Sequence, residues 1–257
     1  MTAATSLNVS NDLKQVLKRL KLSGILPTLP DRVALAKQQH MDYASFLELM
    51  LSDEIARREQ GNLDRRLRQA GFEEVVTLEQ WDSTANVQYD QQLLRDLFGL
   101  HFLERHEHIL LVGPVGVGKS FLASALGHAA CRAGYSVLFV RADTMLKQLA
   151  AARADYSFDR ELHRFVAPDV LAIDDFGLHK LTAQQSSDMY DVIIGRHRHS
   201  SLIITSNRDV AEWVALFDDP ILANSALDRL AHNSYQLVIE GESYRKRTSP
   251  YARRLAQ

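Results

Sequence analysis

The stretch Gly113-Pro114-Val115-Gly116-Val117-Gly118-Lys119-Ser120 decides the fold class of this 257-residue chain. An apolar run, residues 108–112, precedes it, and residues 121–126, which begin with Phe121, have the composition of a helix. A strand, a glycine turn with the spacing Gly-x-x-x-x-Gly-Lys-Ser and a helix are together typical of a phosphate-binding loop. The alternative is a glycine turn that matches by accident, and the flanking strand and helix argue against it. We therefore expect a nucleotide-binding protein of the α/β class.

Each residue type in this loop has a physical role in holding phosphates. The glycines allow backbone N–H groups to turn toward the β- and γ-phosphates, where a side chain would block close approach. Lys119 supplies a compact positive charge, and the N-terminus of the following helix adds a partial one. The Ser120 hydroxyl is a suitable ligand for Mg²⁺. We therefore predict that residues 113–121 bind a nucleoside triphosphate and that Mg²⁺ accompanies it.

Polar residues end two further apolar runs downstream. Asp174 and Asp175 follow residues 170–173, and Asn207 ends the run 201–206. Open α/β sheets place their ligands at the carboxyl ends of the strands. Asp174 is predicted to hold Mg²⁺, directly or through water, and Asp175 to orient or deprotonate the attacking water. The Asn207 amide could bridge the γ-phosphate and that water, although a simple turn residue is the alternative.

Composition excludes several classes of protein. A chain that is 46% hydrophobic and 24% charged has the balance of a soluble globular protein. The single cysteine, Cys131, excludes an internal disulfide framework and a cysteine-rich zinc site. No apolar run approaches the length of a membrane span, and the N-terminus has no signal-peptide pattern. We therefore expect a cytoplasmic protein without a membrane partner.

The net charge of −2 conceals an uneven distribution. Residues 1–72 hold 11 Lys and Arg against 8 Asp and Glu, and residues 241–257 hold 5 against 1, so the middle of the chain is acidic. Of the 30 basic residues 22 are arginine, which binds phosphate oxygens in a bidentate manner. Two basic ends indicate a polyanionic partner, and a solvated surface is an equally good explanation.

Three regions are expected along the chain. Residues 1–72 read as a small all-helical domain with a basic surface, and residues 73–90 as a linker in which Trp81 anchors the chain to residues 91–257, the nucleotide-binding domain. Within the first region, helices are expected at about 11–22 and 31–39. A third is expected from Asp42 onward and a fourth that ends before Gly71. The third helix is expected to bury Phe46, Leu47, Met50, Leu51 and Ile55.

Together with Asp228-Arg229-Leu230, the motifs above resemble those of the AAA+ ATPases, and within them the DnaC/DnaI helicase-loader branch. Three stretches resemble the IstB-like transposition helpers of bacterial insertion sequences more narrowly. They are Asp174-Asp175-Phe176-Gly177-Leu178, Ile203-Ile204-Thr205-Ser206-Asn207-Arg208 and Gly241-Glu242-Ser243-Tyr244-Arg245. The similarity extends from about Leu13 to Arg247. It implies an AAA+ P-loop NTPase with a central parallel five-stranded sheet, a short C-terminal lid and the helical N-terminal domain.

The resemblance also implies roles for arginines and for Asp175. Arg229 matches the arginine finger that reaches the γ-phosphate of a neighbouring subunit, with Arg196 and Arg208 as the next candidates. Arg245 matches the sensor arginine at the start of the lid. Asp175 stands where AAA+ proteins at large have glutamate, and its shorter side chain suits slow hydrolysis in a switch.

The implied function is an ATPase that forms a homo-oligomer on duplex DNA, with little sequence preference, and recruits a DDE-type transposase. The expected DNA contacts are basic residues near both ends and on two central helices, namely Lys14, Lys18, Arg19, Lys21, Arg153, Arg160, Arg245, Lys246 and Arg247. A replicative helicase loader, which would prefer single-stranded DNA, is the first alternative. A metabolic phosphotransferase is the second, and it gives no reason for Asp228-Arg229 or for residues 241–245.

Overall fold

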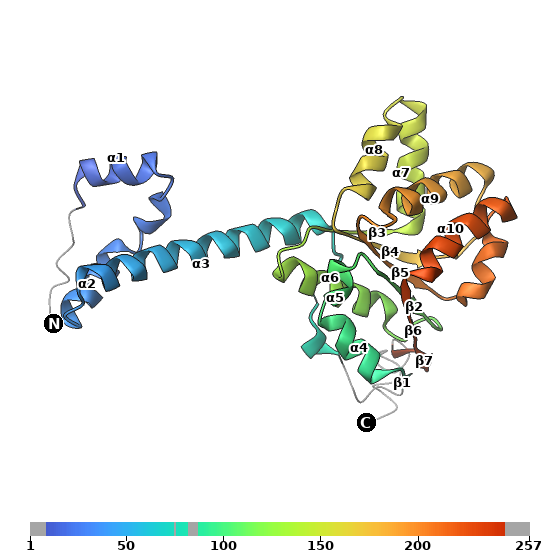
Figure 1. Ribbon diagram of the computed structural model, residues 1–257, viewed down its shortest axis with the longest axis horizontal. Helices are drawn as coiled ribbons and strands as arrows, with labels where there is room; N and C mark the ends of the chain where they lie inside the picture. Colours follow the sequence, from blue (N-terminus) through green and yellow to red (C-terminus); the bar gives the residue numbers. More distant parts are fainter. Residues whose placement is uncertain (1–8, 75, 82–86, 245–257) are drawn as a thin grey trace, which may run out of the picture. The chain divides into compact units, whose positions relative to one another are not determined.

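The computed structural model describes residues 9–74, 76–81 and 87–244 (Figure 1). The chain divides into two compact units, Met1–Arg65 and Arg66–Gln257. Among the described residues, no helix combines the length and the apolarity that crossing a membrane requires. The predicted DNA contacts Arg245, Lys246 and Arg247 and the predicted C-terminal lid lie outside the described residues.

The first unit is helical, as predicted. Its elements are α1 (Asn11–Arg19), the 3₁₀ turn η1 (Ser23–Ile25), α2 (Leu29–Gln38) and the beginning of α3 (Tyr43–Ala70).

Two of the predicted helix boundaries differ from those observed. Asp42 caps α3 as predicted, accepting the backbone N–H groups of Ala44 and Ser45 at 2.9 and 3.0 Å. Asp31, where the second helix was expected to begin, is instead inside α2, which begins two residues earlier, at Leu29. The two helices expected between Asp42 and Gly71 are one continuous helix, because a glycine within a helix costs only about 1 kcal/mol.

The core of the first unit is small, and the predicted inward face of α3 was partly wrong. Met50 is buried and Phe46 packs against the same cluster, but Leu47, Leu51 and Ile55 are 58%, 47% and 57% exposed. These three residues each follow the buried stripe 46, 50, 54 by one position, which is 100° around a helix. The polar residue Glu54 continues that buried stripe, and hydrophobic periodicity could not detect it.

Glu54 is buried because arginines satisfy its carboxylate. Arg57 donates through Nε and Nη2, and Arg58 through Nε, each at 2.8 Å. These hydrogen bonds, that of Arg57 first, lower the pKa of Glu54 to about 2. Two of the basic residues of this unit, Arg57 and Arg58, are therefore committed to Glu54.

The second unit is built on a parallel sheet with the strand order β3-β4-β5-β2-β6. The sheet is the predicted five-stranded one. Its strands are β2 (His108–Val112), β3 (Val137–Arg141), β4 (Val170–Phe176), β5 (Ser201–Ser206) and β6 (Ser234–Val238), and β1 (Val87–Gln88) pairs with β7 (Glu240–Gly241) in a separate antiparallel ladder. Because β2 lies between β5 and β6, the loop that follows β2 is at the point where the strand order reverses, where such sheets bind ligands.

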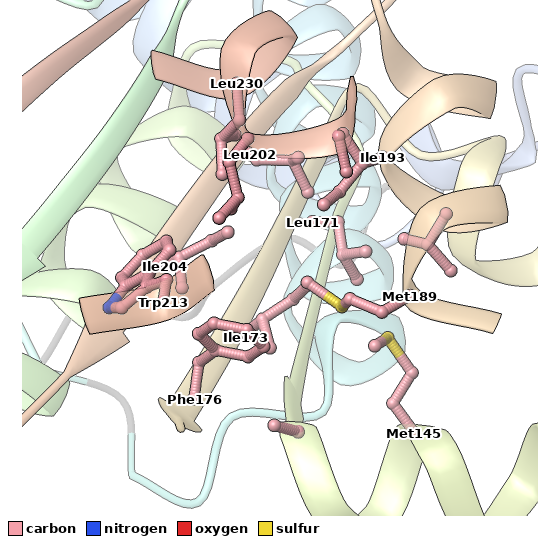
Figure 2. Packing of buried hydrophobic residues seen from close by; sticks show 14 of the residues in the cluster. Met145, Leu171, Ile173, Phe176, Met189, Ile193, Leu202, Ile204, Trp213 and Leu230 are labelled. Atoms are coloured by element: carbon pink, nitrogen blue, oxygen red, sulfur yellow. The ribbon is translucent and has the colours of Figure 1, made fainter. Parts of the chain in front are cut away.

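Helices cover both faces of this sheet (Figure 1). They are α4 (Gln91–Phe98), α5 (His101–Glu104), α6 (Lys119–Arg132), α7 (Ala142–Ala154), α8 (Phe158–Val166), α9 (Ala183–Arg196) and α10 (Pro220–His232), and the 3₁₀ segments η2 (Leu78–Gln80) and η3 (Val210–Leu216) accompany them. Alternate strand residues such as Leu171, Ile173, Leu202 and Ile204 face α7, α9 and α10 in one apolar cluster (Figure 2). The ring of Trp213 packs in this core against the ring of Phe176, with 4.8 Å between the two centroids.

A histidine at the start of β2 makes the stability of the second unit depend on pH. The His108 side chain is 1% exposed, and its Nδ1 accepts the backbone N–H of Leu202 at 3.1 Å. Burial, together with the charge of Arg196, lowers the pKa of His108 to about 4. The folded chain therefore keeps His108 neutral at pH values where the unfolded chain binds a proton.

We expect the free energy of unfolding of this unit to fall by about 2 kcal/mol between pH 7.5 and 5, in the window between the unfolded pKa of about 6.5 and the folded one. His108→Asn, which keeps an acceptor near Leu202 but cannot titrate, should remove this part of the pH dependence. Urea unfolding followed by tryptophan fluorescence measures it, because both tryptophans of the chain lie in the second unit. His101→Asn, at an exposed histidine, is the control, and an unchanged slope in His108→Asn would refute the assignment.

Candidate nucleotide site

The loop after β2 has the tight backbone that its glycines predict. Gly113 has a φ of +152°, and a Cβ there would lie 2.0 Å from the Ile239 carbonyl oxygen. Gly118 has a φ of +99°, and a Cβ there would lie 2.5 Å from the Trp81 ring. Neither position can hold a side chain without moving its neighbours, so both glycines are required by close approach as well as by conformation.

Lys119 joins this loop to the tip of β5. Its side chain is 6% exposed, and its Nζ donates to the carbonyl oxygens of Gly113 and Pro114 at 2.8 and 2.7 Å. A third hydrogen bond, of 2.6 Å, goes to Oδ1 of Asn207. The structure thus brings together two residues that are 88 positions apart and were predicted separately. The ammonium group is thus held between the start of the loop and the tip of β5, and Lys119 lines the cavity there.

Thr205 organises the two aspartates at the end of β4. Its Oγ1 donates to Oδ1 of Asp174 at 2.6 Å and accepts the backbone N–H of Asp175 at 2.9 Å. The pairing of β4 with β5 shifts register between Ile173 and Phe176, and Asp175 has a φ of +57°. Neighbouring side chains on a regular strand point to opposite faces, so this irregularity is what allows both carboxylates to line one cavity.

Arg141 is a residue of the site that the sequence prediction missed. It ends β3 directly beside Asp174, and its Nη2 lies 3.0 Å from Oδ2 of Asp175. A basic residue at the tip of the neighbouring strand was the signal that could have found it. The ion pair holds the predicted catalytic carboxylate against β3.

A cavity of about 540 Å³ is lined by Lys119, Arg141, Asp174, Asp175 and Asn207, among others. Ser120 and Asp174 both face it, and a hydroxyl and a carboxylate are oxygen ligands that suit Mg²⁺, which takes its remaining ligands from phosphates and water. The donor set therefore fits the predicted metal. The other wall comes from Glu73, Glu74 and Trp81, within the segment expected to be a linker.

Trp81 fixes this second wall to the loop. Its ring lies 5.6 Å from that of Phe121, centroid to centroid, and its Nε1 donates to the Tyr89 hydroxyl at 3.0 Å. Residues 73–74, 76–81 and 87–90 therefore belong to the second unit, and Glu73, Glu74, Gln80, Trp81 and Val87 among them line its cavity, so the expected linker has a larger role than connection. The boundary between the compact units falls between Arg65 and Arg66.

Arg229 does not join this cavity. It lines a different cavity of about 1000 Å³, here named the α9–α10 cleft, whose walls include His197, Arg198, Val214 and His232. Asn233 also lies at this cleft, and its backbone carbonyl accepts the N–H of His108 at 2.8 Å. His108 is the first residue of β2, whereas the phosphate loop follows the last residue of β2. The five residues of β2 span about 16 Å. Arg229 is therefore near the opposite edge of the sheet from its own phosphate loop.

Two other predicted arginines have structural partners. Arg196, a candidate finger, is fully buried, and its guanidinium donates to four backbone carbonyl groups, so it cannot reach a neighbouring molecule. Arg153, a predicted DNA contact, pairs with the buried carboxylate of Asp188 at 2.6 Å and stacks on the Phe158 ring at 3.6 Å. We withdraw both assignments. Arg208 donates to the Gly177 carbonyl at 2.7 Å, beside the tip of β4.

The remaining predicted DNA contacts are exposed. Lys14, Lys18, Arg19 and Lys21 lie on or just after α1, and Arg160 lies on α8. Among the described residues, no carboxylate is within ion-pair distance of any of these five side chains. The three cations of α1 and Lys21 just after it, here called the α1 cations, are thus available to an external anion.

Comparison with known proteins identifies the family. The sequence pattern of the IstB-like ATP binding protein family matches residues 15–252. The chain belongs to this family. It is 43% identical over 239 residues to an insertion-sequence protein of Mycobacterium tuberculosis named as ATP-binding, covering 93% of this chain and 95% of that one. An IS21 protein of Pseudomonas aeruginosa, also named as ATP-binding, is 37% identical over 91% of this chain and 89% of its own length.

Solved structures support the fold of the IstB-like chain. The DnaC helicase loader superposes with a TM-score of 0.51 over 58% of this chain and 86% of its own, at 22% identity. DnaI gives a TM-score of 0.55 over 64% of this chain and 90% of its own, at 18% identity. The predicted α/β fold with a central parallel five-stranded sheet is therefore confirmed, and it is the fold of these two proteins.

Proposed function

We propose that this protein is a Mg²⁺-dependent ATPase that assembles on duplex DNA and recruits the transposase of its insertion sequence. The observation that carries the proposal is the hydrogen bond that joins Lys119 to Asn207 in a cavity that Asp174, held by Thr205, also lines. Membership of a family of insertion-sequence ATP-binding proteins supports the biological setting.

The geometry suggests how the residues would divide the chemistry. Lys119 would exchange the two loop carbonyl groups for phosphate oxygens, while Asn207 would orient the attacking water. Ser120 and Asp174 would hold Mg²⁺, which supplies positive charge to the phosphates when bound. Asp175 would accept the proton of the water. Asp175 is also held by an ion pair with Arg141, and a contact that has to open before the carboxylate meets the water suits the slow turnover of a switch.

The DNA part of the proposal rests on the exposed cations of α1. Contacts to phosphates position a protein on DNA without reading its sequence. Binding should therefore show weak sequence preference, and it should need ATP because only an assembly aligns many such patches. A fourfold variant would carry glutamine in place of Lys14, Lys18, Arg19 and Lys21. In this variant, the slope of log affinity for duplex DNA against log salt concentration should become shallower by up to about 3–4 units per engaged subunit, at about 0.9 per lost contact.

A salt titration of wild type and the fourfold variant on duplex and single-stranded DNA measures this slope. ATP affinity should not change, and Lys37→Gln, at an exposed lysine outside α1, serves as the control. Equal affinity and slope in wild type and variant would mean that the α1 cations only solubilise the helix. Tighter ATP-dependent binding to the single strand would favour a helicase loader over a transposition helper.

A further inference from the structure

Thr205 places a hydroxyl at the end of a buried strand. It follows the apolar run 202–204 of β5, and its own side chain is 1% exposed. A buried hydroxyl is unfavourable unless hydrogen bonds replace its contacts with water, and valine has almost the same shape without that cost. The two hydrogen bonds of the Thr205 side chain go to Asp174 and Asp175, which line the nucleotide cavity. The hydroxyl is therefore directed at the site.

The pairing of β4 with β5 explains why a hydroxyl is needed here. The segment 173–176 of β4 faces the segment 204–206 of β5, and the end residues of the two segments pair with each other. Asp174 and Asp175 therefore stand opposite Thr205 alone. A bulge of this kind leaves a backbone group without its partner in the ladder. The Thr205 hydroxyl supplies that partner by accepting the N–H of Asp175 at 2.9 Å.

The bulge gives Asp175 an uncommon backbone conformation. Its φ of +57° is in the left-handed region, which few residues with a Cβ adopt, although aspartate is among those that tolerate it best. This conformation allows Asp175 to line the same cavity as Asp174, whereas neighbours on a regular strand point to opposite faces. Because Thr205 holds the N–H of Asp175, the position of the predicted catalytic carboxylate depends on the Thr205 hydroxyl.

The same hydroxyl orients Asp174. A threonine hydroxyl has one hydrogen, and the oxygen already accepts the N–H of Asp175, so the hydrogen is donated to Oδ1 of Asp174 at 2.6 Å. A carboxylate with one oxygen held in this way has its other oxygen in a defined position for a metal ion. Removing a group that orients a metal ligand typically costs about 10–100-fold in metal affinity or activity.

We propose that Thr205 is a positioning residue of the nucleotide site, and that its hydroxyl couples the binding of Mg²⁺ at Asp174 to the placement of Asp175 against the attacking water. Because one hydroxyl makes both contacts, a movement of Asp174 toward the metal is passed to the backbone of Asp175. Thr205 acts through the two aspartates and not by touching ATP or the metal. This inference rests on the proposed Mg²⁺-dependent ATPase function and adds Thr205 to it.

Thr205→Val and Thr205→Ser separate the hydroxyl from the shape of the side chain. Thr205→Val keeps the shape and removes both hydrogen bonds. The Mg²⁺ concentration for half-maximal turnover should therefore rise, and turnover at saturating Mg²⁺ should fall, each about tenfold or more. Thr205→Ser keeps the hydroxyl and should stay close to wild type in both measurements.

Calorimetric titration with ATP gives a readout that does not depend on turnover. In the presence of EDTA, wild type and both variants should bind ATP equally well, because the phosphate loop and Lys119 are unchanged. The gain in ATP affinity that Mg²⁺ brings should shrink about tenfold in Thr205→Val and persist in Thr205→Ser. A residue that only stabilised the fold would not change this gain.

The control removes a hydroxyl from the other end of the same strand. Ser201 is buried at the start of β5, and its Oγ has no hydrogen-bond partner among the described residues. Ser201→Ala should keep the wild-type turnover and Mg²⁺ dependence.

Three results would overturn the role of Thr205 while the proposed function stands. The first is a Thr205→Val protein that melts at a lower temperature but keeps wild-type turnover and Mg²⁺ dependence. The second is equal damage in Thr205→Ser and Thr205→Val, and the third is ATP binding weakened to the same extent with and without Mg²⁺. If Mg²⁺ changes neither the ATP affinity nor the turnover of the wild-type protein, the proposed function fails and the inference fails with it.

Discussion

Lys119→Ala is expected to weaken ATP binding about 100-fold. Loss of one phosphate-site charge in a partly dry cavity costs about 2–4 kcal/mol, and each 1.4 kcal/mol is a factor of ten in affinity. The structure adds a second reason, because Lys119 also connects Gly113 and Pro114 to Asn207. Without it, both the charge and the link between the loop and β5 are lost. Titration calorimetry with ATP and Mg²⁺ measures the affinity.

Two controls separate binding from folding. Lys180→Ala removes an exposed lysine of the same unit and should bind ATP as wild type does. Thermal unfolding without nucleotide shows whether the carbonyl groups that Lys119 leaves unpaired destabilise the fold. Wild-type ATP affinity in a folded Lys119→Ala protein would remove the basis for the nucleotide site.

The phosphate half of the site could be predicted because its chemistry is local. The glycines, Lys119 and Ser120 lie within eight consecutive residues, and the backbone conformations they need are rare enough to restrict the residue types. Asp174, Asp175 and Asn207 could be predicted because parallel strands bring their carboxyl ends to one edge. The contacts of Lys119 with Asn207 follow from that topology.

The other half of the site could not be predicted, since it depends on long-range contacts. Trp81 was expected to anchor the chain to the nucleotide-binding domain, but nothing local shows that it lines the cavity, because that depends on its packing against Gly118 and Phe121. Arg153 and Asp188 are 35 residues apart, and only the packing of α7 against α9 makes their ion pair. Basic residues were therefore assigned to DNA on charge alone, and burial decides which of them are available.

The same limit applies to Arg196 and Arg229. Both are arginines in the last turn of a helix, and no feature of their sequences predicts that one is fully buried while the other lines an open cleft. The structure eliminates the first as a finger and places the second at the opposite edge of the sheet from the phosphate loop. A role for Arg229 in hydrolysis consequently requires a second copy of the chain.

Arg229→Ala should therefore bind ATP with wild-type affinity and hydrolyse it up to about 10³-fold more slowly, the lower range of effects known for arginine fingers. Asp175→Ala should also bind ATP without turning it over. A one-to-one mixture of the two should regain activity, because about one contact in four pairs a chain that retains Asp175 with a neighbour that retains Arg229. Phosphate release across a series of mixing ratios measures the rescue, and Arg208→Ala, tested in the same way, shows whether the remaining finger candidate contributes. If light scattering proves that mixed assemblies form and no ratio restores turnover, then the finger acts within its own chain or is a different residue.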